Sequence, residues 1–158
     1  MAALADECAR CGEFETGGWL VGPRAAAWHA DHTVVEAAVA AKARTLSSVA
    51  LDATAFLAMD EHLVAERRRG KRFDLRVIGD FHSHPSGHGT PSEGDLESWA
   101  RDLATIADDN ASLTSLIVTR RDGRDSWARP IITGWITRHA RSSLGERMVV
   151  EPATVKVA

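Results

Sequence analysis

The segment Asp80–Asp95, DFHSHPSGHGTPSEGD, constrains the fold more than any other part of this sequence. It follows the apolar run LRVIGDFH, which is typical of a buried β-strand, and it precedes a stretch with apolar residues at helical spacing. The segment itself combines turn-forming Gly, Pro and Ser residues with three histidines and two aspartates. The sequence therefore predicts a strand, a compact loop and a helix in direct succession, with good metal ligands at the junctions.

His82 and His84 are separated by one residue at the end of the predicted strand. Residues i and i+2 of an extended chain point to the same side, so both imidazoles can face one point while Ser83 points elsewhere. Asp95 follows after ten intervening residues, a run rich enough in turn formers to lead back to the histidines. Two imidazoles and one carboxylate make a three-ligand zinc site of the catalytic kind, with the fourth position left open.

Ser92 and Asp95 also fit a purely structural pattern. SEGD is an acidic capping box, with a serine at the N-cap of a helix and an acid three residues later. Taken alone, the cap explains both residues better than metal binding does. The two interpretations are compatible, because a cap places Asp95 in the first helical turn. His88 lies between glycines in the loop and is interpreted as a solvated histidine, not as a ligand.

The remaining elements predict a mixed α/β domain with a central, largely β core. Helices are expected over 2–12, over 53–69 after the capping residue Asp52, and over 92–108. Strands are expected over 16–23, 33–40, 47–52, 75–82 and 112–119, with a hairpin partner over 128–138 and a short last strand, RMVVE. The third helix should bury one face, formed by Leu96, Trp99, Ala100, Leu103, Ile106 and Ala107. We expect one domain over residues 1–150 and a C-terminal tail over 151–158.

Charge and targeting signals narrow the function classes. The chain of 158 residues has a formal net charge of −3 and a pI of about 6.1, whereas nucleic-acid-binding domains are usually basic, so no nucleic-acid partner is expected. The N-terminus does not resemble a signal peptide, and no apolar stretch is long enough for a membrane helix. Low cysteine content fits a reducing cytoplasm, and the bias toward alanine and arginine suggests a bacterial source.

Two further features are interpreted as structural and not as functional sites. Cys8 and Cys11 form a C-x-x-C pair inside the first predicted helix, but no second pair exists for a zinc finger, so they are interpreted as ordinary helix residues. The basic run Arg67–Arg72 is interpreted as a solvated helix end, with contact to an acidic partner as the functional alternative.

The motif HSHPSGHGTPSEGD resembles the signature of the JAMM metalloproteases, also called the JAB or MPN+ family, which is H-x-H-P followed by a short loop and S-x-x-D. The upstream segment Glu15–Gly22, ETGGWLVG, resembles the family's other mark, a glutamate followed by glycines and a short apolar strand. H-x-H alone would be a weak signal, whereas the full set is highly specific.

The resemblance implies a site and a fold. His82, His84 and Asp95 would bind Zn²⁺, Glu15 would act as general base and then acid, and Ser92 would donate a hydrogen bond to the oxyanion intermediate. The fold would be a curved, mainly antiparallel sheet flanked by helices, similar to cytidine deaminases. Glu13 is the alternative base, because alternation puts it on the same side as Glu15, but the Glu-Thr-Gly-Gly frame selects Glu15.

The resemblance also implies a substrate class. Members cut isopeptide or peptide bonds after the C-terminal tail of ubiquitin-like proteins, and some work beside activating and conjugating enzymes of the same operon. Other bacterial members process sulfur-carrier proteins, which gives an alternative of precursor processing. A third alternative, from another class, is a non-catalytic MPN-type scaffold; the intact ligand set argues against it. A relative with a role in DNA repair finds no support in the acidic pI.

Overall fold

The described residues adopt an α/β fold around an open sheet of six strands. The computed structural model describes residues 2–23, 35, 37–40, 53–70, 75–85, 87–105, 112–120, 127, 129–143 and 145–156. The strand order is β2-β1-β3-β4-β5-β6, and every neighbouring pair is antiparallel except the parallel pair of β3 and β4. The predicted mainly antiparallel sheet flanked by helices is therefore confirmed.

The elements follow the predicted order. They are α1 (Ala2–Cys11), β1 (Gly17–Pro23), β2 (Ala37–Ala40), α2 (Ala53–Arg68), β3 (Leu75–His84), α3 (Glu93–Ala104), β4 (Ser112–Thr119), β5 (Ile131–Ser142) and β6 (Gly145–Ala153). β3 is two residues longer than predicted and includes both histidines of the H-x-H motif. The strand expected over 47–52 and the capping residue Asp52 lie outside the described residues.

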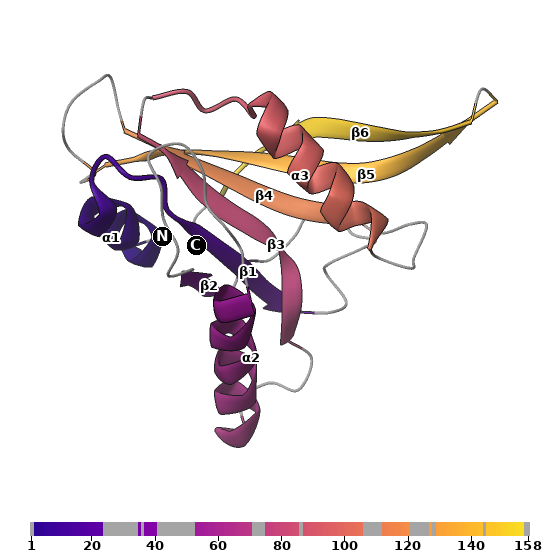
Figure 1. The fold of residues 1–158 in the computed structure, drawn as a ribbon. Coiled ribbons are helices and arrows are strands. Elements are labelled where there is room, and N and C mark those ends of the chain that lie inside the picture. The colour runs from indigo at the N-terminus through magenta and orange to yellow at the C-terminus, as the bar shows by residue number, and fades with distance from the viewer. Residues whose placement is uncertain are drawn as a thin grey trace.

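Helices cover both faces of the sheet. Trp99 of α3 donates a hydrogen bond to Asp80 of β3. Asp80 lies directly opposite Trp19 of β1, so the side chains of Asp80 and Trp19 point to the same face of the sheet. Trp19 in turn packs against the cluster that contains Met59 of α2, so α2 and α3 share one face. α1 lies on the opposite face, where Leu4 packs in another cluster. Figure 1 shows α3 in front of β4 and β5, and the β5–β6 hairpin extending beyond the other strands.

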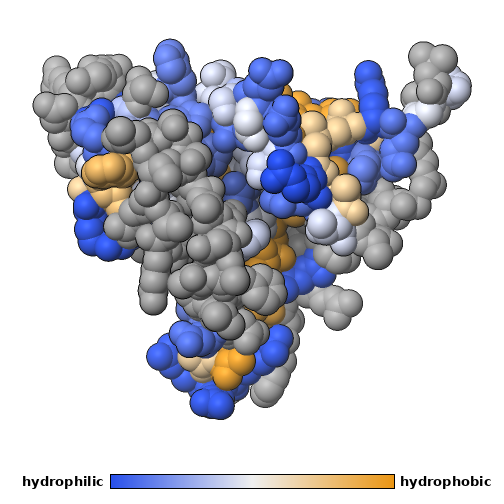
Figure 2. All heavy atoms as spheres, in the orientation of Figure 1, coloured by the Kyte–Doolittle hydropathy of each residue, from blue (hydrophilic) through white to orange (hydrophobic). Residues whose placement is uncertain are grey.

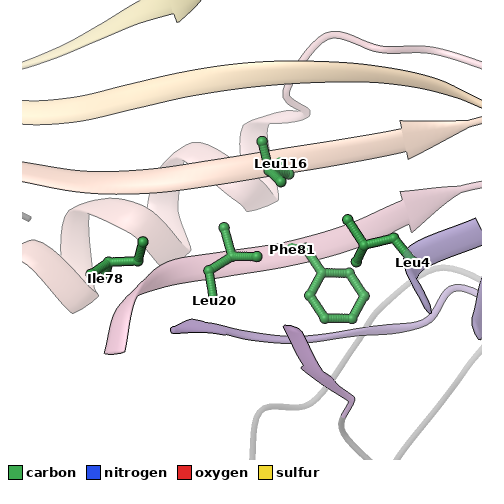
Figure 3. Packing of buried hydrophobic residues seen from close by; sticks show 5 residues of the cluster. All are labelled: Leu4, Leu20, Ile78, Phe81 and Leu116. Carbon is green, nitrogen blue, oxygen red and sulfur yellow. The ribbon is translucent and has the colours of Figure 1, made fainter. Parts of the chain in front are cut away.

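The main core lies on the α1 face. It is formed by Leu4, Leu20, Ile78, Phe81 and Leu116, all of which are buried (Figure 3). Val155 packs against this cluster from beyond the end of β6. Residue 150, the expected end of the domain, lies inside β6, and the division into a domain and a C-terminal tail stays a prediction.

A β-bulge in β3 determines which way the histidines point. Gly79 pairs with Leu20 and Val77 with the next residue, Val21, so Ile78 is the extra residue in β3. Val77 packs with the cluster under α2, and Asp80, three residues later, faces the same side. Regular alternation would place these two on opposite faces, so the bulge shifts the following side chains by one. It therefore turns the two histidines toward α3 instead of α1.

Gly79 at this bulge has no room for a side chain. A Cβ atom there would lie 1.7 Å from the carbonyl oxygen of Thr114 in β4, and the φ angle of 157° is one that other residues rarely adopt. The glycine thus permits the close approach of β3 and β4 just before the ligand-bearing end of β3.

The surface is mixed on the face that Figure 2 shows. Hydrophobic residues form small separate areas there, between hydrophilic side chains that are prominent along α3. Among the helices of the described part, none is long and apolar enough to cross a membrane.

At the end of α2, Gly70 has the left-handed φ of 66° that commonly terminates a helix, and the exposed Arg69 pairs with Glu66.

Candidate metal centre

Three potential ligands converge where β3 meets α3. His82 and His84 are buried at the end of β3, and Asp95 lies half-buried in the first turn of α3. The Nε2 atoms of the two histidines are 3.0 Å apart. Asp95 Oδ1 lies 3.2 Å from His82 Nε2, and Asp95 Oδ2 lies 3.4 Å from His84 Nε2. The predicted ligands are thus brought together, in a group that could hold a metal ion.

These separations fit the donor set of a zinc ion. Ligand bonds of 2.0–2.1 Å in a tetrahedral site imply edges of about 3.3–3.4 Å between neighbouring donors. The observed distances between histidine nitrogens and carboxylate oxygens, 3.2 and 3.4 Å, are close to such edges, and the two nitrogens are slightly nearer to each other. These two distances involve different oxygens of Asp95; taken one ligand atom per residue, the donors lie within 4.8 Å of one another, so the side chains would rearrange for one oxygen to face both histidines.

The outer nitrogen of each histidine faces an acceptor. Nδ1 of His84 lies 2.7 Å from the backbone carbonyl oxygen of His88, which can only accept a hydrogen bond. In the neutral imidazole, Nδ1 of His84 therefore carries the hydrogen and Nε2 keeps a lone pair for the metal. Nδ1 of His82 lies 3.6 Å from Oδ2 of Asp80. Both rings are thus oriented in the way that metal-binding histidines usually are.

Asp80 is a site residue that the sequence prediction missed. Its Oδ1 accepts a hydrogen bond of 2.5 Å from Ser115 of β4, and its Oδ2 accepts one of 3.4 Å from Trp99 of α3. The carboxylate is thus held between two elements while it faces His82. The available signal was alternation along the strand, because Asp80 precedes His82 by two residues and so points to the same side.

The capping box and the ligand role of Asp95 coexist. Ser92 is the N-cap of α3, its Oγ accepts a hydrogen bond from the Asp95 backbone, and the Asp95 carboxylate accepts one from the Ser92 backbone. The Ser92 hydroxyl also lies 2.7 Å from Asp95 Oδ2. The predicted box is confirmed, and it fixes the carboxylate that faces both histidines.

The electrostatics of the site favour a positive charge. Burial alone would lower the pKa of His82, but Asp80 and Asp95 on either side outweigh it and raise this pKa to about 10. Burial alone would raise the pKa of Asp95, but hydrogen bonds from His82 and His84 hold it well below its usual range. The carboxylates of Asp80 and Asp95 thus favour a positive charge between them.

Glu15 lies beside the ligand group, whereas Glu13 does not face it. Burial raises the pKa of the Glu15 carboxyl, and the charges of His84 and His82 act in the opposite direction. The antiparallel register of β1 and β3, continued by two residues from the pair Gly17–His82, places Glu15 opposite His84. The exposed Glu13 carboxylate is paired with Arg120 instead. This geometry favours Glu15 as the base, and the assignment stays a prediction.

The loop between β3 and α3 is held at its middle. The carbonyl oxygen of Gly89 accepts hydrogen bonds from Thr133 Oγ1, at 2.6 Å, and from Trp135 Nε1, at 3.3 Å. The neighbouring carbonyl of His88 faces His84, while the His88 side chain is exposed, in agreement with its interpretation as a solvated histidine. Two side chains of β5 thereby support the backbone that orients a ligand.

The two cysteines lie away from the ligand group. Both are buried in α1, and Cys8 packs on the opposite face of the sheet. Desolvation by burial, followed by the charges of Cys11 and Glu7, raises the pKa of the Cys8 thiol to about 12. A thiol with so high a pKa is a poor nucleophile and a poor metal ligand at neutral pH.

The family assignment agrees with this site. Residues 1–130 match the family model of prokaryotic homologs of the JAB domain, and the chain belongs to this family. A comparison with curated proteins finds no match. The JAB-domain family comprises peptidases, among them zinc metalloisopeptidases, and MPN-type scaffolds. Its JAMM-type members bind zinc, and the present chain carries a His-His-Asp group able to hold a metal.

Proposed function

We propose that this protein is a zinc-dependent isopeptidase or peptidase that hydrolyses the bond after the C-terminal tail of a ubiquitin-like protein. The observation that carries the proposal is the complete group of His82, His84 and Asp95 with Glu15 beside it. A scaffold has no need for oriented imidazoles next to a half-buried carboxyl. Family membership supports the same reaction class.

Each residue has a separate chemical task in this proposal. His82, His84 and Asp95 would hold Zn²⁺, which when bound acidifies water and polarises a carbonyl group. Glu15 takes a proton from the attacking water and returns it to the leaving amine. Burial raises the pKa of Glu15, which brings the carboxyl nearer to the operating pH and suits it to both transfers. Ser92 donates a hydrogen bond to the oxyanion once its hydroxyl turns from Asp95.

The substrate would approach the end of the sheet where β3 stops. Phe14, 50% exposed, precedes Glu15, and the exposed Ile131 pairs with Thr119, the partner of His84 in β4. Because His82 and His84 are buried, we expect the extended tail of a modifier, and not its folded body, to reach the ligands. Because the tail would pass the anchored loop at Gly89, a small final residue, most readily glycine, should be preferred.

The test of this function compares wild type with Glu15→Gln. The probe is a folded bacterial ubiquitin-like protein with a fluorescent reporter fused after its final tail residue, and the enzyme is loaded with one equivalent of zinc. We expect wild type to release the reporter, and Glu15→Gln to keep zinc but lose about a hundredfold or more in kcat. If Glu13→Gln abolishes turnover and Glu15→Gln does not, the base is wrongly assigned.

A second series addresses specificity and the alternatives. Fusions that differ only in the last tail residue should be cut in the order glycine, then leucine and phenylalanine, and unstructured casein should resist. Equal rates would remove the preference for a modifier-specific enzyme. Sulfur-carrier fusions cut in place of ubiquitin-like ones would identify precursor processing. A zinc-loaded protein that cuts none of these probes would point to a scaffold. Activating and conjugating enzymes are the partners to seek in a cytoplasmic assembly.

A further inference from the structure

Arg120 connects the two segments that carry the proposed base and a metal ligand. We infer that it is a positioning residue, which holds the segment 12–16 with Glu15 against the end of β3 with His84. The inference rests on the proposed function, because only a base needs such precise placement beside the metal site.

The contacts of Arg120 reach both segments at once. From its position directly after β4, its Nη1 and Nη2 donate to the two carboxylate oxygens of Glu13, at 2.6 and 3.0 Å. Its Nη2 and Nε donate to the carbonyl oxygen of Pro85, at 2.7 and 3.0 Å. The Arg120 side chain is only 12% exposed, whereas that of Glu13 is 66% exposed. This is therefore an oriented, mostly buried guanidinium and not a loose surface ion pair.

The guanidinium group is also supported from a third direction. Its central carbon lies 5.8 Å from the ring centroid of the buried Trp127, a cation–π distance. The planar fork of arginine is needed for this arrangement, because one compact ammonium could not serve Glu13 and Pro85 with the same geometry.

A second anchor lies on the other side of Glu15. The Thr16 amide donates to Ser83 Oγ at 3.0 Å, and the Ser83 amide donates to the Thr16 carbonyl oxygen at 2.7 Å. Glu15 is thus placed between two anchors, at Glu13 and Thr16. Ser83 holds the anchor at Thr16 directly, and Pro85 holds the anchor at Glu13 through Arg120. Ser83 and Pro85 are the two neighbours of His84 in the sequence.

This arrangement fixes the base relative to the ligand. Segment 12–16 lies between the end of α1 at Cys11 and the start of β1 at Gly17, and its backbone hydrogen bonds are the turn contacts of Gly12 and Phe14 and the contact of Thr16 with Ser83. Loss of Arg120 would leave the anchor at Thr16 and the turn hydrogen bonds of Gly12 and Phe14, and would remove the link between Glu13 and Pro85. A misplacement of about 1 Å in a catalytic group costs on the order of 10²-fold in rate.

The experiment compares Arg120→Met and Arg120→Lys with the control Arg138→Met. Arg138 is matched because it also forms an ion pair, at 2.9 Å with Glu151, but on the exposed β5–β6 hairpin. Amide hydrogen exchange is measured by mass spectrometry on the full chain, with zinc content. kcat and KM are measured with the glycine-ended reporter fusion.

We expect Arg120→Met to speed exchange in residues 12–16 by about tenfold or more, the scale of a lost charge-assisted hydrogen bond, while α3 and β5 keep their rates. Zinc content should stay unchanged, kcat should fall about 10- to 100-fold, and KM should stay within about twofold. For Arg120→Lys, the exchange rates and kcat should lie between those of Arg120→Met and wild type. For Arg138→Met, both should equal those of wild type.

Several results would overturn the inference. Unchanged exchange in segment 12–16, or faster exchange throughout the chain, would deny a local tether. A raised KM with unchanged kcat would make Arg120 a substrate contact instead. If Arg120→Met does not fold, Glu13→Gln weakens one arm alone, because the amide keeps one acceptor oxygen but loses the charge, and it should give a weaker form of the same local effects. If wild type cuts no probe, the proposed function fails, while the exchange data still decide whether the tether exists.

Discussion

The Nδ1 atom of His84 lies 2.7 Å from the backbone carbonyl oxygen of His88, so the loop after β3 orients one of the metal ligands. The contact uses the main chain of His88, and the side chain of this residue is exposed. Two histidines four residues apart thus serve the same site in different ways, one through its ring and the other through its carbonyl group.

This relationship predicts opposite results for two matched substitutions. Purified wild type should hold about one zinc ion per chain, as expected of a three-ligand site, and His84→Ala should lose it because two ligands remain. His88→Ala should keep the ion, since the backbone carbonyl persists. Elemental analysis of both variants is the measurement. Full zinc content in His84→Ala would place the metal elsewhere.

A second prediction concerns the carboxylate that faces His82. Asp80→Asn should weaken zinc binding about 10- to 100-fold, the usual range for loss of a carboxylate behind a ligating histidine. The amide is of similar size; its one oxygen can accept from Trp99 and its NH2 group can donate to the Ser115 hydroxyl, so the fold should persist. Competition with a chelator measures the affinity. The control is Asp6→Asn on the exposed side of α1, which should bind like wild type; equal affinity in both variants would deny Asp80 this role.

Local patterns made much of the site predictable. The alternation of His82 and His84 followed from the period of an extended strand, and the SEGD box marked the start of α3. The expected end of the second helix at residue 69 agrees with Gly70, whose φ is left-handed. In each case, the residues that determine the geometry are neighbours in the sequence, so the pattern carries the information.

Other parts depend on contacts between distant segments. Arg120 and Glu13 are separated by 107 positions, and no local pattern signals their pairing. The parallel pairing of β3 with β4 and the extra residue Ile78 follow from register, which tertiary packing decides. The same holds for Thr133, whose hydroxyl reaches Gly89 from a distant strand.

A third prediction concerns Cys8 and alkaline pH. The pKa of Cys8 is raised from 9.0 to about 12 in the folded protein, so the folded state favours the protonated thiol. Below about pH 9 this difference has no effect, and above it the unfolded thiolate draws the equilibrium toward unfolding, by up to about 1.4 kcal/mol per pH unit. Cys8→Ala should therefore lose stability less steeply than wild type between pH 9 and about 11 in denaturant titrations. The variant should also keep full zinc content; parallel slopes would contradict the burial argument.

The last prediction separates the two roles of Ser92, which caps α3 and is the proposed oxyanion donor. Alanine removes both the cap and the hydroxyl, whereas glycine removes the hydroxyl but costs only a few tenths of a kcal/mol as an N-cap. Ser92→Ala should therefore lose about 1 kcal/mol of stability, and Ser92→Gly clearly less. Turnover per folded molecule should nevertheless fall on the order of 10²-fold in both variants, because each lacks the donor.

Thermal unfolding and reporter release, measured on zinc-loaded Ser92→Ala and Ser92→Gly, decide between the two roles. The hydroxyl also donates to Asp95 Oδ2, so zinc content must be compared to exclude a loss through the ligand. If the rate of Ser92→Gly stays near that of wild type while Ser92→Ala is slow, the serine acts only through the cap. If both are slow with zinc in place and only Ser92→Ala melts early, the hydroxyl takes part in the reaction itself, because the rate of Ser92→Gly then falls although the start of α3 stays stable.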